Sequence, residues 1–205
     1  KSSAASDVYK RQVMVWLHGG GFSTGSANQE QYNGKDLSES GDVVVVSVNH
    51  RLGAAGFLDL SAYDDKYQYS GNVGLTDIVK ALEWIQNNIE DFGGDPDNVT
   101  LFGQSGGGAK VLAMMTSPYA KGLFHRGIVE SGATETMGVT FASQEASTHL
   151  TERILDQLGI DNNNIEYLQQ IDWNKLEDAS QEALQETAEE FQIPAPVSYT
   201  HLRAH

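Results

Sequence analysis

The 205-residue sequence has no cysteine, only four prolines and far fewer basic than acidic residues. Without cysteine there is no disulfide, thiolate metal site, iron–sulfur cluster or cysteine nucleophile. Thirteen basic residues against 28 acidic ones give a formal charge of −15, which argues against binding to nucleic acid or an anionic membrane surface. No apolar run approaches the ~20 residues of a membrane span, and no signal peptide is visible. With 40% hydrophobic residues, the sequence predicts a soluble globular protein of about one domain.

The two ends differ in character from the rest of the chain. Residues 1–12 are polar without a usable period, and residues 195–205 follow an acidic helical pattern that has no capping residues. Both ends resemble translated adapter sequence, so we predict that they are non-native and exclude them from the fold. Ordinary frayed termini are the alternative. The remaining 13–194 are predicted to form one partial domain.

Short runs rich in β-branched residues predict four strands, at 13–17, 42–49, 99–103 and 127–131. Runs that are apolar on both faces are typical of strands buried in a parallel sheet. Apolar residues at helical spacing follow over 74–91, and a buried helix is predicted over 105–115. Because strands and helices alternate, we predict an α/β fold with a mostly parallel central sheet and flanking helices.

After residue 139 the pattern becomes helical and strongly acidic. Apolar residues over 146–158 share one helical face, and Gly159 is placed to end that helix. A second helix is predicted over 173–191. Residues 139–194 contain twelve acidic residues against two basic ones. We interpret this charge as a solvated helical face.

The segment GQSGG at 103–107 matches G-x-S-x-G. It follows a predicted strand and begins a predicted helix, which is the context of a nucleophile elbow, and glycine is needed beside the serine because the backbone is crowded there. Such a turn raises the hydroxyl above the sheet and places it at a helix N-terminus, where backbone N–H groups favour negative charge. Ser105 is therefore the predicted nucleophile.

The segment HGGGF at 18–22 follows the first predicted strand directly. Acyl transfer places negative charge on the former carbonyl oxygen, and an HGGG loop supplies a main-chain N–H to meet it together with the residue after the nucleophile, here Gly106. A phosphate loop would need G-x-x-x-x-G-K-[ST], which is absent. A dinucleotide motif is missed by one residue, because the spacing is Gly19, Gly21, Gly25. We predict no cofactor and no metal site.

With both motifs present, the sequence resembles the type-B carboxylesterases, the carboxylesterase/cholinesterase branch of the α/β-hydrolase superfamily. The resemblance runs over about 13–191 and is carried by HGGGF, by NHRLGAAGFL at 49–58, by the long block at 71–108 and by LFHRGIVESGA at 123–133. It implies that Ser105 is the nucleophile. It also implies that Gly20, Gly21 and Gly106 supply the N–H groups of the oxyanion hole. Many members have an acidic residue before the serine, and the neutral Gln104 resembles bacterial members and gives no reason to expect a preference for cationic esters.

A serine hydroxyl needs a base, and in this superfamily the order along the chain is Ser, then Asp or Glu, then His. Downstream of Ser105 and before the suspect tail, only His125 and His149 occur. No acidic residue lies between Ser105 and His125, and His149 falls in a polar helical pattern. Because family members are much longer, we predict that the triad acid and histidine lie outside these 205 residues and that the chain alone hydrolyses esters poorly or not at all.

The sequence therefore predicts a serine carboxylic-ester hydrolase, present in part, whose partners are a small-molecule ester and water. The alternative is a non-catalytic adhesion or binding module on the same scaffold; such members tend to lose the serine or the glycines, which this chain keeps. The resemblance also implies a buried ion pair between Arg51 and Asp77. We interpret His18 as part of the glycine loop and not as a metal ligand, and His50 as a framework residue. Oligomeric state stays open, and a bacterial cytoplasmic or secreted location is compatible with the sequence.

Overall fold

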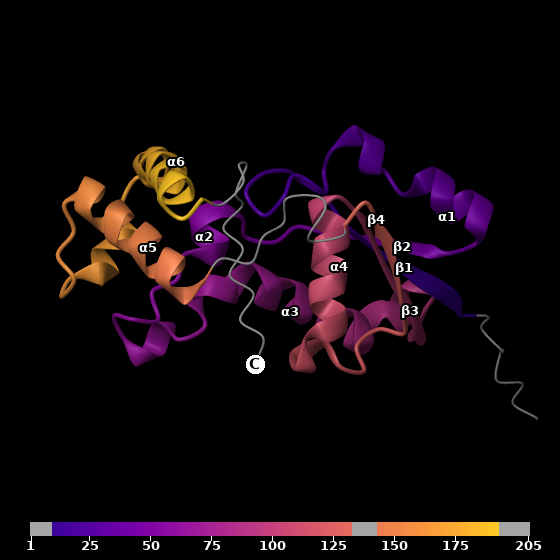
Figure 1. The fold of residues 1–205 in the computed structure, drawn as a ribbon. Helices are drawn as coiled ribbons and strands as arrows, with labels where there is room; N and C mark the ends of the chain where they lie inside the picture. Colours follow the sequence, from indigo (N-terminus) through magenta and orange to yellow (C-terminus); the bar gives the residue numbers. More distant parts are fainter. Residues whose placement is uncertain (1–9, 133–142, 193–205) are drawn as a thin grey trace, which may run out of the picture.

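A four-stranded parallel sheet forms the centre of the protein, seen in a computed structural model that describes residues 10–132 and 143–192 (Figure 1). The strands are β1 (Arg11–Leu17), β2 (Val44–Val48), β3 (Gly94–Gln104) and β4 (Arg126–Glu130). Their order in the sheet is β2-β1-β3-β4, and every pair is parallel. The predicted α/β class and all four predicted strands are confirmed, although β1 and β3 begin earlier in the sequence than predicted.

The inner and outer strands differ in burial. The side chains of the inner strands without exposed surface are Val13, Val15, Leu17, Val99 and Leu101. By contrast, β2 is mostly half-buried and β4 is largely exposed, with Ile128 exposed by 45%. The prediction that the run at 42–49 is buried on both faces is therefore wrong for β2. The strands β2 and β4 are the edge strands, and each has a neighbouring strand on one side only within the described residues.

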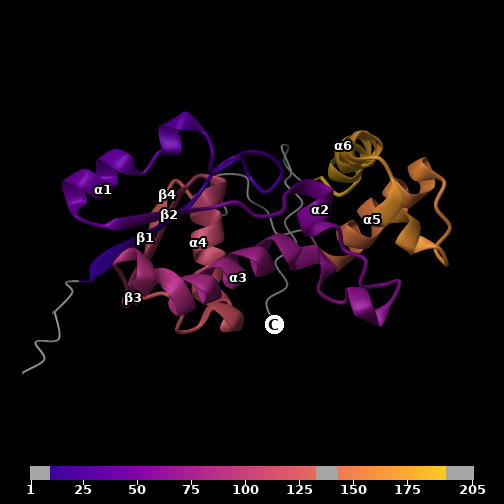
Figure 2. The same ribbon diagram turned by 180° about the vertical axis from the view of Figure 1, so that it is seen from behind.

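Helices flank the sheet and continue beyond it (Figures 1 and 2). Their bounds are α1 (Lys35–Gly41), α2 (Gly53–Phe57), α3 (Val73–Asn88), α4 (Gly106–Thr116), α5 (Gln144–Leu158) and α6 (Trp173–Glu190). The four predicted helices are confirmed, with a 3-10 turn at Ile89–Phe92 ending the first of them. The short helices α1 and α2 were not predicted, because α1 has a single large apolar residue and α2 contains two glycines.

Different segments of the chain pack against the two faces of the sheet. On one face α4 lies against β4, because a Cβ added at Gly127 would lie 3.0 Å from Val111 in α4. On the other face Trp16 of β1 packs between Tyr32 and Phe102, with ring centroids 5.0 and 4.9 Å away. The segment before α1 therefore covers part of the face opposite α4.

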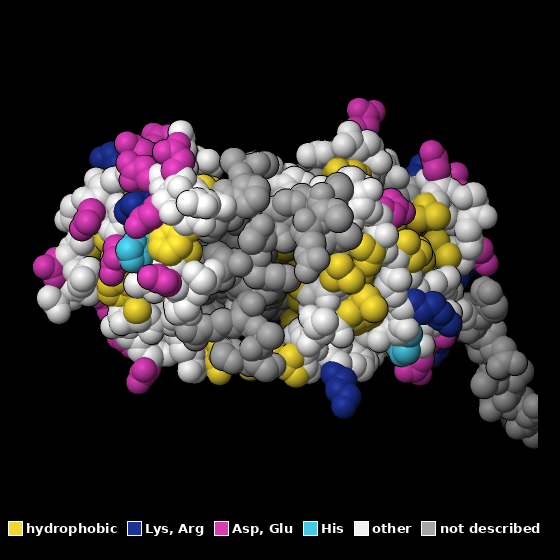
Figure 3. Space-filling model, in the orientation of Figure 1, with side chains coloured by type: hydrophobic (Ala, Val, Ile, Leu, Met, Phe, Trp, Pro, Cys, Tyr) yellow, Lys and Arg dark blue, Asp and Glu magenta, His cyan; other side chains and the backbone are white. Residues whose placement is uncertain are grey.

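The helices α5 and α6 form a second part of the same core, well away from the sheet in Figure 1. The carboxylate of Asp59 accepts hydrogen bonds from Gln144 Nε2 (2.9 Å) and Ser147 Oγ (3.2 Å), which fasten α5 to the loop after α2. Gly159 ends α5 at φ +65°, as predicted. Figure 3 shows the Asp and Glu side chains gathered over α5 and α6, the solvated acidic face expected from the sequence. Within the described residues, no helix combines the length and the apolar composition needed to cross a bilayer.

The ends predicted to be non-native, 1–12 and 195–205, lie mostly outside the described residues. Residues 10–12 are the exception, and Arg11 is hydrogen-bonded to two other parts of the fold. Its N–H donates to Gly93 O (2.9 Å), and its Nε donates to Asp42 Oδ1 (2.5 Å). The origin of the two ends and the domain limits 13–194 stay predictions.

Candidate active site

Ser105 lies in the turn between β3 and α4, at the carboxyl end of the sheet. Its backbone has φ 56° and ψ −123°, in a region that residues other than glycine rarely adopt. The conformation is held from two sides: Ser105 N–H donates to Glu130 O of β4 (2.8 Å), and Ser105 O accepts from Ala109 N–H of α4 (3.1 Å). A strained residue of this kind costs about 1–3 kcal/mol and persists only where its surroundings enforce it.

The glycines around Ser105 allow the backbone to approach other segments closely. A Cβ at Gly107 would lie 2.0 Å from Leu17 O at the end of β1, nearer than side chains tolerate. At Gly106, the added Cβ would lie 2.4 Å from Gly21 O. The first turn of α4 therefore rests directly on the end of β1 and on the loop that follows it.

That loop, His18–Phe22, faces the serine. Gly20 and Gly21 have positive φ angles of 90° and 63°, and a Cβ at Gly19 would lie 3.7 Å from Ser105 Cβ. Within the described residues, no hydrogen bond uses the N–H of Gly20 or Gly21 as its donor. The structure thus brings the predicted residues of the glycine loop against Ser105, as the sequence required.

Three titratable side chains lie close together at the start of the loop. His18 is 1% exposed and stacks on His50, with ring centroids 5.1 Å apart and an interplanar angle of 9°. Lys110 of α4 has no exposed surface; its Nζ donates to His18 O (3.0 Å) and lies 5.3 Å from the centroid of the Phe22 ring. Burial lowers the pKa of Lys110 to about 7.

The role of Lys110 in this cluster was not predicted, because a lysine inside a helical pattern usually faces water. The position of Lys110 relative to the glycines could have indicated that it is buried. Lys110 comes four residues after Gly106 and three after Gly107, so all three lie on one helix face. Since the two glycines must approach other backbone, that face is buried. His18 begins the glycine loop, as the sequence predicted, and His50 packs against its ring.

His50 gives the protein a pH-dependent stability. Burial, followed by the charge of Lys110, lowers the pKa of His50 from 6.5 to about 4. Between pH 6.5 and 4 the unfolded chain binds a proton that the folded chain does not, so stability falls as the pH falls through this window. We expect a loss of about 2 kcal/mol, measured by urea unfolding at several pH values. His50→Phe keeps an aromatic ring against His18 but cannot titrate, so an equally steep pH dependence in this variant would contradict the assignment.

Two histidines follow Ser105 in the described residues. His125 lies far from the serine turn, and His149 faces α6. His125 exchanges two hydrogen bonds with Val99: its N–H donates to Val99 O (2.8 Å), and its Nδ1 accepts from Val99 N–H (3.1 Å). Val99 comes six residues before Ser105 along β3, about 20 Å away at ~3.3 Å per residue. His149 faces α6, where its Nδ1 lies 3.8 Å from Glu190 and its ring meets Phe191 edge-on.

Arg51 and Asp77 form the ion pair that the resemblance implied, but the pair is not buried. Arg51 Nη2 donates to Asp77 Oδ1 (2.6 Å) and Arg51 Nε donates to Asp77 Oδ2 (2.9 Å). The two side chains are 56% and 24% exposed. Partial burial disfavours the charged carboxylate, yet these hydrogen bonds keep the pKa of Asp77 below its usual value. The pair is solvated because more than half of the Arg51 side chain is exposed.

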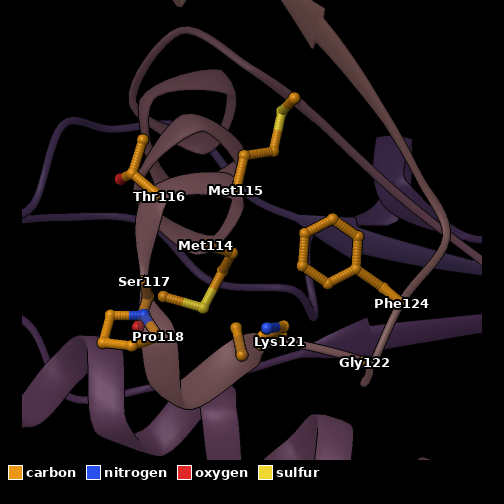
Figure 4. A pocket seen from close by; sticks show the side chains of 9 residues that line it. Met114, Met115, Thr116, Ser117, Pro118, Lys121, Gly122 and Phe124 are labelled. Atoms are coloured by element: carbon orange, nitrogen blue, oxygen red, sulfur yellow. The ribbon is translucent and has the colours of Figure 1, made fainter.

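A pocket of about 430 Å³ lies at the other end of α4 (Figure 4). Met114, Met115, Pro118 and Phe124 contribute to its lining. Met115 comes nine residues after Gly106, about 13 Å along the helix at ~1.5 Å per residue. The pocket is therefore separate from the serine turn.

A parallel sheet whose inner strand ends in a strained serine, with a glycine loop packed against the following helix, defines an α/β-hydrolase. Comparison with known proteins agrees. The family model described as "Carboxylesterase family" matches residues 3–203, and the chain belongs to this family.

The relatives found are much longer than this chain. A para-nitrobenzyl esterase from Bacillus subtilis (strain 168) is 42% identical over 181 residues, which are 88% of this chain and 34% of that protein. A phenmedipham hydrolase from Pseudarthrobacter oxydans is 42% identical over 170 residues, covering 83% and 32%. A solved esterase from anaerobic Clostridium hathewayi superposes with a TM-score of 0.83 at 44% identity, covering 89% and 36%. The chain thus spans about a third of the length of these relatives.

Proposed function

We propose that the protein containing this chain is a serine carboxylic-ester hydrolase. Ser105 Oγ attacks the ester carbonyl carbon while a base takes its proton, which gives a tetrahedral oxyanion. The N–H groups of Gly20, Gly21 and Gly106 stabilise that oxyanion. Its collapse returns the proton to the leaving alcohol and leaves an acyl-enzyme, which water then cleaves to the carboxylic acid and free serine. The residues named require no cofactor for this sequence of steps.

One observation carries the proposal: the strained Ser105 backbone lies directly against the glycine loop. The contact between Gly106 and Gly21 brings the start of α4 to the loop. The first N–H groups of α4 have no partner within the helix, which suits an oxyanion beside Ser105. A binding module on the same scaffold has no need of a strained serine or of this close glycine packing, so ester hydrolysis is favoured over that alternative.

We further propose that the triad acid and histidine are supplied by sequence outside these 205 residues. The partners of His125 and His149 support this, since one bonds to Val99 and the other faces α6. Within the described residues, Ser105 Oγ makes no hydrogen bond to a histidine. On this proposal the chain by itself retains the oxyanion hole but lacks the base that activates the serine.

The neutral Gln104 beside the nucleophile favours an uncharged ester. Gln104 is exposed and its Oε1 would lie 3.4 Å from a Cβ at Gly19, so it borders the space between the serine and the loop. A carboxylate at this place would attract a cationic substrate, and an amide does not. Para-nitrobenzyl esters, named for one relative, are therefore the first substrates to assay.

A fluorophosphonate probe tests the nucleophile directly, because it labels only an activated serine. We expect the full-length protein to be labelled at Ser105, located by mass spectrometry of the labelled peptide, and Ser105→Ala to stay unlabelled. The 205-residue chain alone is expected to react far more slowly. A folded full-length protein that is not labelled at Ser105 would instead support the binding module. Rapid labelling of the chain alone would contradict the external base.

A further inference from the structure

The first three carbonyl groups of the glycine loop are each held by a hydrogen bond. His18 O accepts from Lys110 Nζ (3.0 Å), and Gly19 O lies 2.8 Å from His18 Nδ1. Because a carbonyl only accepts, His18 Nδ1 carries the proton in this bond. Gly20 O accepts from both the N–H and the hydroxyl of Thr24, at 3.1 and 3.2 Å. Three successive peptide units are thus fixed, by Lys110, by the His18 side chain and by Thr24.

Fixing the carbonyls also fixes the N–H groups. In a trans peptide the C=O and the N–H of one unit point in opposite directions. The anchors on Gly19 O and Gly20 O therefore set the directions of the N–H groups of Gly20 and Gly21, the proposed oxyanion donors. These two glycines have no side chain to hold them, and their backbone freedom is large. The hydrogen bonds to Gly19 O and Gly20 O restrain this backbone in place of side chains.

Lys110 holds both ends of this segment. Its Nζ bonds to the carbonyl immediately before the glycines and lies over the ring of Phe22 immediately after them. Phe22 is itself fully buried and packs edge-on against Phe57, with centroids 5.2 Å apart, so it forms a firm support. The same helix face carries Gly106 and Gly107, which contact Gly21 and Leu17. Lys110 thus ties the loop to the helix that begins at the nucleophile.

A contribution to stability does not explain why Lys110 is buried. Within the described residues it forms no salt bridge, and the two histidines near it add no negative charge. A buried charge without a counterion costs stability, and an apolar residue of similar volume is often at least as favourable. With a pKa near 7, both the ammonium and the amine form can donate to His18 O, so the bond persists across neutral pH.

We propose that Lys110 is a positioning residue for ester hydrolysis, which orients the glycine loop through His18 O and Phe22 without touching the substrate. The role rests on the proposed function. Its loss is expected to leave substrate binding intact and to weaken the transition state, because the oxyanion forms only there.

Lys110→Met in the full-length protein tests the proposal, with Lys121→Met as the matched control. Lys121 is an exposed lysine that follows the C-terminus of α4, so the control makes the same chemical change away from the loop. We expect kcat for a para-nitrobenzyl ester to fall about 10-fold with KM unchanged in Lys110→Met. Loss of an oxyanion donor costs on the order of 100-fold or more, and the effect here is smaller because the bond to His18 O fixes the N–H of Gly19 and reaches the donors only through the next peptide units. Its melting temperature is expected to be equal to or higher than that of the wild type. Lys121→Met should match the wild type in both measurements.

Hydrogen exchange supplies a readout that does not depend on catalysis. The amides that donate to the loop, Thr24 N–H to Gly20 O and Gly53 N–H to Phe22 O, are expected to exchange faster in Lys110→Met than in the wild type, while those of α5 are unchanged. An unchanged kcat, or unchanged exchange at the loop, overturns the proposal. A wild-type protein without esterase activity would remove the proposed function instead, and the exchange rates would still decide whether Lys110 holds the loop.

Discussion

Replacing Ser105 by glycine is expected to abolish ester hydrolysis and to stabilise the protein at the same time. Without the hydroxyl no acyl-enzyme forms, and kcat should fall by a factor on the order of 10⁵–10⁶, the loss seen when a serine nucleophile is removed. Stability should rise because Ser105 has φ 56° and ψ −123°, where a side chain is strained and glycine is not. The expected gain in the free energy of unfolding is about 1 kcal/mol, after the greater chain entropy of glycine is subtracted.

Ser105→Ala is the matched control, because alanine loses the hydroxyl but keeps the Cβ that causes the strain. Both variants should be inactive toward para-nitrobenzyl esters, and only the glycine variant should have a raised melting temperature. The backbone bond from Ser105 N–H to Glu130 O remains possible in both. Activity of either variant above about one hundredth of the wild type would contradict the role of Ser105 as nucleophile. Equal stability of the two variants would contradict strain at this position.

The features that the sequence predicted correctly depend on residues close together along the chain. A β-branched run predicts a strand, and glycines on both sides of Ser105 predict a tight turn, since each follows from local sterics. The helix stop at Gly159 is of the same kind, with φ +65° at the position where a left-handed residue is needed. The glycine loop at 18–22 was also predicted, because it follows its strand directly.

The features that were missed depend on what lies far away in sequence. The burial of a strand depends on its neighbours, so 42–49 has the composition of an inner strand yet forms the half-buried edge strand β2. Lys110 contacts His18, which is 92 positions earlier, and no local pattern reports that contact. The pair of Arg51 and Asp77 was implied correctly by family resemblance, but its solvation follows only from where α3 lies.

The second large effect is expected from a substitution at Gly107, where α4 packs tightly on the end of β1. A Cβ at this position would lie 2.0 Å from Leu17 O and 3.0 Å from His18 O, both main-chain atoms. A flexible side chain could move away, but Leu17 O belongs to an inner strand that is paired on both sides. We therefore expect Gly107→Ala to force α4 away from the sheet and to lower the free energy of unfolding by more than about 4 kcal/mol, enough to prevent most of the protein from folding.

Gly41→Ala is the control for Gly107→Ala, because the same change at the end of α1 meets only side-chain atoms of Val43 and Leu37, none nearer than 3.6 Å. Soluble yield and thermal unfolding of the two variants should differ sharply, with the control close to the wild type. If Gly107→Ala folds normally, its activity becomes informative, since a shifted α4 would carry Ser105 and Gly106 away from the glycine loop. Normal stability together with normal kcat would show that α4 does not rest on the end of β1. The close packing that places the serine beside the loop would then have to be abandoned.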